Sequence, residues 1–293
     1  MLSCRTKLAA EHTGKAGRGI TMGSTTPPND VPEARRISRD ALREAERLSG
    51  SQVVVVESPG LPTLSAIRFA RGSAPAHVIE YRTDYAWAVD YLVVFQCGML
   101  RRRVNAAASG PIDLGPSAKG LKAITAALAK AAAVKLGPAS ARQLAVQLLQ
   151  GVVVHLRSIP LGLAIDSLIE TEFEVFRETQ RRVLADQLRE NEQALDAAGA
   201  GLLPQRVVDA TCAISAALAL FWAERWTQPG LAAPYQYSGH AAAGSQLLEV
   251  WHQNSSDGVR DHAVIDAWAE LLGIADWYTW VADEHDDSGE SER

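Results

Sequence analysis

The chain is poor in cysteine, with only Cys4, Cys97 and Cys212 among its 293 residues. These three lie far apart and form no C-x-x-C pair, so neither a disulfide framework nor a thiolate zinc site is expected. A chain that makes no use of disulfides fits a reducing compartment. We therefore expect a cytoplasmic protein.

Positive charge is not in excess either. Lys and Arg number 29 against 34 Asp and Glu, which gives a formal net charge of -5. Because nucleic-acid binding draws most of its affinity from a basic surface that faces phosphates, no direct contact with nucleic acid is expected.

Long apolar runs are also missing. The most apolar windows, 144–156 and 210–223, are short and contain glutamine, threonine or serine, whereas a membrane-spanning helix needs about 20 apolar residues. Both windows are expected to form buried core helices, and no membrane partner is expected. The first 21 residues contain no apolar stretch typical of a signal peptide.

Three catalytic signatures are absent from the sequence: the G-x-S-x-G elbow, the G-x-x-x-x-G-K-[ST] loop and the glycine fingerprint of dinucleotide-binding domains. Acyl transfer on a hydrolase scaffold and nucleotide-dependent chemistry therefore lack their usual parts. Their absence makes a binding protein a more natural expectation than an enzyme.

What the sequence does contain is hydrophobic residues, at 47%, with helical spacing over most of its length. A first helix is expected from Pro32 to Gly50, because proline fits the first helical turn and glycine ends helices. Three short strands follow at about 52–82, and the tight turns between them predict an antiparallel sheet. Helical patterns then continue, with a break at Pro160 and a last helix over 260–281. The expected fold class is α+β, mostly helical, with a small three-stranded antiparallel sheet and a C-terminal helical bundle.

Four parts are expected along the chain. Residues 1–29 have the composition of a disordered leader, and the acidic stretch 283–293 that of a disordered tail. Between them we expect an α+β region over 30–135 and a helical region over 136–282, packed together as one unit.

One expected helix stands out because it directly follows the three strands. It begins near Val89, and after an apolar stretch it runs Phe95-Gln96-Cys97-Gly98-Met99, followed by leucine and arginine. This layout resembles the zinc metallopeptidases of the ImmA/IrrE type and related gluzincins, in which a small sheet precedes a helix that bears H-E-x-x-H. The resemblance spans about residues 50–105 and implies a metallopeptidase-like region with a zincin-like helix.

The resemblance implies that the zinc chemistry is lost here. In H-E-x-x-H the two histidines hold Zn²⁺, and the glutamate takes a proton from metal-bound water. Phe95 has no lone pair, Met99 offers only a thioether, and Gln96 lacks the basicity of glutamate. We expect no catalytic residue at these positions, no metal and no other cofactor. Cys97 is expected to be a packed small residue. An alternative for the whole helix is that it is a buried amphipathic helix with no relationship to the metallopeptidases.

The same family takes a third zinc ligand, usually an acid, from a later helix. Asp166 and Glu170 are candidates that share a helix face by their i, i+4 spacing. With no histidine pair to join, they are expected to pair with arginines such as Arg157. His155 is expected to be a hydrogen-bonded buried histidine or a cation at a helix end. A polar pocket of His155, Arg157, Asp166 and Glu170 would serve an enzyme of unrecognised type.

Most of the tryptophans lie in the last third of the chain. Trp222 and Trp226 are spaced i, i+4, and Trp277 and Trp280 are spaced i, i+3. This spacing is typical of large residues that seal a helix–helix core. The same four residues are candidates for a partner interface or an apolar ligand pocket, since aromatic anchors dominate binding hot spots.

The leading hypothesis from the sequence is a catalytically inactive, metallopeptidase-like intracellular protein with a regulatory role. It would act through contacts with another protein or with a second copy of itself. Two alternatives stay open: a helical binding module for a small apolar ligand or a peptide, and an enzyme of unrecognised type that uses the acids near 166–174.

Overall fold

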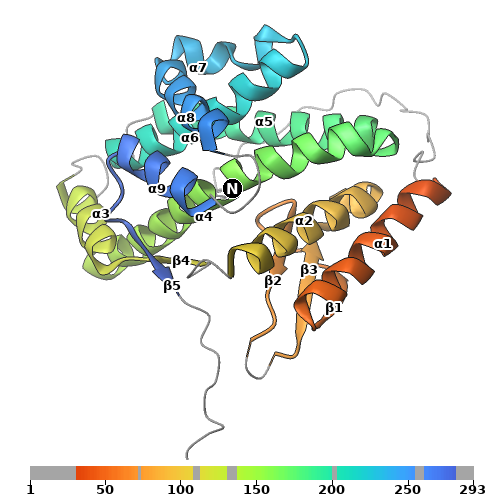
Figure 1. The fold of residues 1–293 in the computed structure, drawn as a ribbon. Helices are drawn as coiled ribbons and strands as arrows, with labels where there is room; N and C mark the ends of the chain where they lie inside the picture. Colours follow the sequence, from red (N-terminus) through yellow and green to blue (C-terminus); the bar gives the residue numbers. More distant parts are fainter. Residues whose placement is uncertain are drawn as a thin grey trace, which may run out of the picture.

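The computed structural model describes six stretches of the chain: residues 31–71, 74–107, 113–130, 137–199, 203–254 and 261–281. The expected leader at 1–29 and tail at 283–293 lie outside these residues. The described part of the chain is α+β and mostly helical (Figure 1), which confirms the predicted fold class.

The first helix, α1, spans Pro32–Ser49 and has proline in its first turn. Gly50 follows it with a φ of 70°, in the left-handed region, and its N–H donates to the carbonyl of Glu46 at 2.9 Å. Glycine adopts this conformation without the steric cost that a Cβ would bring, so α1 ends where the sequence predicts.

The three strands β1 (Gln52–Glu57), β2 (Ser65–Arg68) and β3 (Ala76–Tyr81) form a mixed sheet in the order β1-β3-β2. β3 is antiparallel to β2 but parallel to β1, so the prediction of an all-antiparallel sheet was wrong. The strand directions alternate as expected, but the third strand lies between the first two. Tight turns in a sequence reveal that the chain reverses, and they do not reveal which strands become neighbours.

A short 3-10 helix, η1 (Thr83–Ala88), leads into α2 (Val89–Ala107). Figure 1 shows α1 and α2 side by side across the sheet. Cys97 of α2 is 6% exposed within the core that joins these layers, and burial raises the pKa of its thiol to about 12. Cys97 is therefore a packing residue, as its place on the helix predicts.

The remaining elements are β4 (Asp113–Pro116), α3 (Ala118–Lys130), α4 (Pro138–Glu172), η2 (Glu174–Phe176), α5 (Arg177–Gly199), α6 (Gln205–Arg225), η3 (Pro229–Leu231), α7 (Ala233–Tyr237), α8 (Ala241–Asn254), α9 (Asp261–Leu271) and β5 (Tyr278–Val281).

Two boundaries differ from the prediction. α4 continues through Pro160, because residues on both sides of the proline are buried in the core and this packing offsets the hydrogen bond that proline cannot make. The helix expected over 260–281 ends at Leu271 and is followed by β5, which pairs antiparallel with β4. The sequence Tyr-Thr-Trp-Val of β5 is rich in strand-forming residues, and this local preference prevails over the helical pattern.

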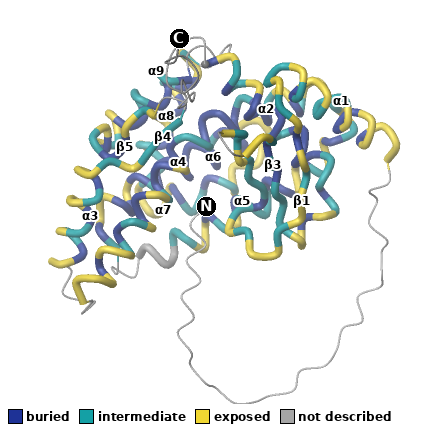
Figure 2. The backbone as a smooth tube through the Cα atoms, turned by 90° about the horizontal axis from the view of Figure 1, so that it is seen from below, coloured by how far each residue is buried: buried dark blue, intermediate teal, exposed yellow. Residues whose placement is uncertain are grey.

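Helices α4 and α6 form the centre of the protein. Figure 2 shows buried segments concentrated along both, with exposed segments on outer helices such as α1 and α3. Among the described helices, these two are long and apolar enough to cross a membrane, and 67% and 78% of their most apolar windows are buried within the protein. Such burial is the environment of core helices.

α4 belongs to two hydrophobic clusters. Leu156 and Leu163 pack with α6, α8 and α9 in the larger cluster, while Ile165 and Ile169 pack with α1 and α2 in a second cluster. The pairing of β4 with β5 also joins the first half of the chain to its end. These contacts link the predicted regions 30–135 and 136–282.

Candidate functional site

An apolar cavity of about 310 Å³ lies between α2 and α4, and we call it the α2–α4 pocket. Side chains of β2, β4, α5 and α6 complete its walls. Its lining is mostly apolar, and the apolar residues include Leu64, Ile67, Leu92, Phe95, Met99, Leu114, Val153, Ile159, Val183 and Leu218.

The three motif positions of α2 all line this pocket. Phe95, Gln96 and Met99 are among its wall residues, and the amide of Gln96 donates to the hydroxyl of Ser65 at 2.8 Å. These side chains do not fit a zinc ion, because a phenyl ring offers no donor atom and a thioether is a poor zinc ligand. Among the described residues, no group of three or more His, Cys, Asp or Glu side chains could hold a metal ion.

One glycine of α2, Gly98, allows α2 and α4 to approach each other beside this pocket. A Cβ on Gly98 would lie 2.8 Å from the Cγ2 atom of Ile165, closer than real Cβ contacts, so α4 occupies the space that a side chain would need. Across the interface, Gly162 faces the ring of Phe95, whose Cζ atom would be 3.5 Å from a Cβ, an ordinary contact distance. The small fourth member of the motif is thus required by helix packing.

Asp166 of α4 is a buried carboxyl group of the pocket wall, with 4% exposure. Its Oδ1 atom accepts a hydrogen bond from the Tyr91 hydroxyl at 2.6 Å and another from the Gln180 amide at 3.1 Å. Burial raises the pKa of Asp166 to about 7, although both hydrogen bonds act in the opposite direction. Asp166 is therefore a polar group that gains or loses its charge near neutral pH.

His155 lies on nearly the same face of α4 as Asp166, since 11 residues along a helix return to within about 20°. It lines the pocket, is 3% exposed, and has no hydrogen-bond partner on either ring nitrogen within the described part of the chain. Burial lowers the pKa of His155 to about 3, so the ring is neutral and has one donor and one acceptor. His155 is buried as expected, and none of the described residues forms a hydrogen bond with its ring. The alternative of a helix-end cation was wrong, because α4 continues to Glu172 and burial keeps the ring neutral.

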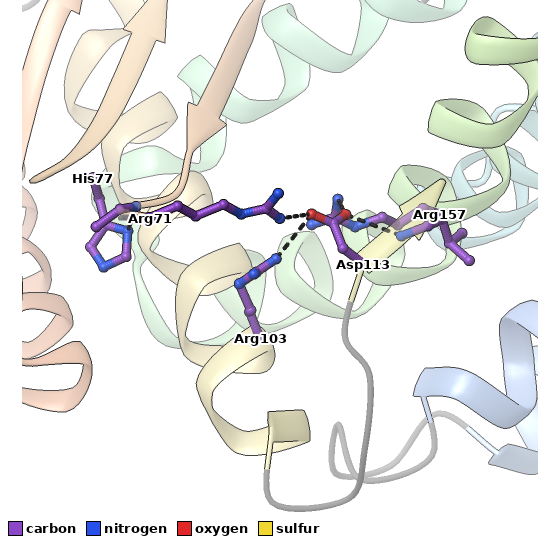
Figure 3. A network of polar contacts seen from close by, with 7 residues as sticks. Arg71, His77, Arg103, Asp113 and Arg157 are labelled. Carbon is purple, nitrogen blue, oxygen red and sulfur yellow. Dashed lines mark hydrogen bonds and ion pairs between the residues drawn. The ribbon is translucent and has the colours of Figure 1, made fainter. Parts of the chain in front are cut away.

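Arg157, also in the pocket wall, forms an ion pair with Asp113, a residue that the sequence did not identify as part of the site. Its Nη1 atom donates to Oδ1 of Asp113 at 2.6 Å, and Arg103 reaches Oδ2 of the same carboxylate at 3.2 Å. Arg71 contacts that carboxylate as well, and Figure 3 shows Arg71 and Arg103 approaching it from one side and Arg157 from the other. Burial alone would raise the pKa of Asp113, but the three guanidinium groups lower it.

The other acid of the predicted pocket lies elsewhere. Glu170 forms an ion pair with Arg225 and accepts a hydrogen bond from the indole of Trp226 at 3.1 Å. The structure therefore brings together His155, Arg157 and Asp166, and it leaves Glu170 out of the pocket wall. Arg157, which was expected to pair with Asp166 or Glu170, pairs with Asp113 instead.

The four candidate interface tryptophans divide into two kinds. Trp222 and Trp277 are 0% and 2% exposed, which places them in the core. Trp226 and Trp280 are half-buried, and the indole of Trp280 donates to Asp266 at 2.9 Å. Only the second pair has surface to offer a partner.

A second depression lies between α1, α2 and the C-terminal half of α4 and holds about 1140 Å³. We call it the α1–α4 groove. Charged side chains of both signs line it, including Arg36, Asp40 and Arg101, together with apolar residues such as the exposed Leu168. Apolar residues within a polar rim are the usual anatomy of protein-contact surfaces.

Sequence reasoning missed Tyr91, Gln180 and Asp113. Tyr91 could have been predicted from the sequence, because Tyr91, Phe95 and Met99 follow each other at i, i+4 spacing and must share a face of α2. No sequence pattern predicts Gln180 or Asp113, since they come from separate elements that only the tertiary structure brings to α4.

Comparison with known proteins found no family model, no curated protein and no solved structure that matches this chain.

Proposed function

We propose that this protein is a non-catalytic protein of metallopeptidase-like layout that binds a small, largely apolar molecule in the α2–α4 pocket. It would act through contacts with another protein or with a second copy of itself. One observation carries the proposal: Phe95, Gln96 and Met99, which would stand at the positions of H-E-x-x-H in the proposed resemblance, line one cavity together with His155 and Asp166.

The size and chemistry of the cavity support a ligand. Its volume of about 310 Å³ lies at the lower end of the range for small-molecule sites. Apolar walls with a few polar groups are the usual composition of such sites. The two unpartnered nitrogens of His155 favour a ligand with a polar atom, because an unsatisfied buried polar group costs about 1–3 kcal/mol.

Binding of a neutral fluorescent probe, N-phenyl-1-naphthylamine, tests the proposal. Its emission should rise when wild-type protein is added, because the probe enters an apolar site. Ser158→Phe places a large ring in the pocket wall and should abolish this rise. Ser140→Phe, at an exposed position near the start of the same helix, should leave it unchanged. An equal signal from both variants would show that the probe binds elsewhere and would contradict the proposal.

The α1–α4 groove supports the second half of the proposal, contact with a protein. The pocket and the groove share α2 and α4, so a ligand in the pocket adjoins the helices that would meet a partner. Sedimentation of the wild type with and without the probe tests self-association. A probe-dependent change in mass would support a second copy as partner, and an unchanged monomer would exclude it.

A further inference from the structure

The charged groups around the pocket indicate which polar head group its ligand carries. We infer that the α2–α4 pocket takes a small amphiphile with one carboxylate, whose apolar body lies between α2 and α4 and whose carboxylate binds Arg157 in place of, or beside, Asp113. This inference rests on the proposed function and names its ligand class.

The polarity of the pocket wall favours an anion over a cation. The titratable side chains among its lining residues are Tyr91, His155, Arg157 and Asp166. His155 is neutral because burial lowers its pKa to about 3, and below neutral pH the Asp166 carboxyl is mostly protonated because burial raises its pKa to about 7. Arg157 is then the one charged group among these lining residues, and its charge is positive.

Arg157 retains hydrogen-bonding capacity. Within the described part of the chain its guanidinium has one hydrogen-bond acceptor, Oδ1 of Asp113. A guanidinium carries five N–H donors and binds carboxylates through two parallel bonds. A ligand carboxylate can therefore add to this cation or replace Asp113.

Asp113 lies next to the pocket in the chain as well as in space. Its neighbour Leu114 lines the cavity, so β4 presents the competing carboxylate at the edge of the apolar wall. The contact between Asp113 and Arg157 thus shows how the carboxylate of a ligand would bind this arginine.

The first test compares three molecules with the same eight-carbon chain on the wild-type protein by calorimetric titration: octanoate, 1-octanol and octylamine. At about pH 6 a carboxylic acid is ionised and octylamine is positively charged. Octanoate should bind about tenfold or more tightly than 1-octanol, because a charge-assisted pair to arginine is added, and octylamine should bind most weakly.

Two variants test the role of the arginine. Arg157→Met keeps an unbranched side chain and should bring octanoate to within about twofold of 1-octanol, since the charged partner is gone. Asp113→Asn removes the competing charge and should tighten octanoate about fivefold without changing 1-octanol. Asp209→Asn, at an exposed position of α6, is the matched control and should change neither.

The outcomes separate this inference from the proposed function. If octanoate and 1-octanol bind equally, or octylamine binds best, the carboxylate inference is wrong while the apolar pocket stands. If none of the three binds and N-phenyl-1-naphthylamine gives no signal either, both are wrong. Should a variant fail to fold, the comparison of the three molecules on the wild type still decides the inference.

Discussion

At the scale of single residues, Asp166 and His155 oppose each other in their pH dependence. The folded-state pKa of Asp166 is raised from 3.8 to about 7, so the folded protein holds a proton that the unfolded chain has lost, and stability falls as pH rises through this interval. The pKa of His155 is lowered from 6.5 to about 3, so the unfolded chain binds the extra proton and stability rises with pH.

We therefore predict a specific change in Asp166→Asn. The variant removes the contribution of Asp166, which falls with pH, and keeps that of His155, which rises with pH. Its free energy of unfolding relative to the wild type should therefore increase between pH 4 and pH 7 by up to about 1.4 kcal/mol per pH unit. Above pH 7 the difference should level off. Urea unfolding at several pH values measures it, with Glu249→Gln at an exposed position of α8 as control. A difference that stays constant with pH would show that Asp166 does not titrate in this interval.

Single residues also show which parts of the α2–α4 pocket could be predicted from the sequence. Phe95 and Met99 share a helix face by spacing alone, which places these two pocket residues correctly on one helix. His155 and Asp166 were expected on two helices separated by Pro160, and only the continuity of α4 brings them to one face. Asp113 was not predictable. Its three arginine partners come from residue 71, the end of α2 and the middle of α4, and no local pattern brings them together.

At the scale of elements, α2 carries the proposed relationship to the metallopeptidases. Restoring the motif by Phe95→His, Gln96→Glu and Met99→His would direct two histidines into a pocket that already holds the Asp166 carboxyl. The triple variant is expected to bind zinc at micromolar concentration or better, as two histidines and a carboxylate form a common zinc site.

A competition titration against a chromophoric zinc chelator measures this affinity. Adding Asp166→Asn to the triple variant should weaken zinc binding about tenfold or more, because a ligand is removed. The variant with Phe95→His alone serves as the control and should bind no better than the wild type. A folded triple variant without zinc affinity would argue against the metallopeptidase-like layout.

Elements also show why helices are easier to predict than sheets. α1 and α6 follow from apolar spacing within one segment, together with the glycine or proline at their ends. The neighbours of β3 depend on chain crossings after β1, and the pairing of β4 with β5 joins segments more than 150 residues apart. Local spacing contains no information about such partners.

At the scale of the whole molecule, the two predicted regions should unfold as one unit. α4 contributes to both main hydrophobic clusters, and β4 pairs with β5 across the chain. Six of the seven tryptophans lie after residue 220, so their fluorescence in Trp87→Phe reports the second region alone. Its urea transition should coincide with that of the far-ultraviolet circular dichroism. Two separated transitions would instead show independent domains.

The continuity of α4 also constrains how this chain can change in evolution. Each residue turns a helix by about 100°, so inserting or deleting one residue near Pro160 would rotate Ile165 and Ile169 away from α1 and α2 while Leu156 stayed in place. The pocket would lose Asp166 from its wall at the same step. Homologous chains should therefore tolerate substitutions along α4 but keep its length between Leu156 and Ile169 unchanged.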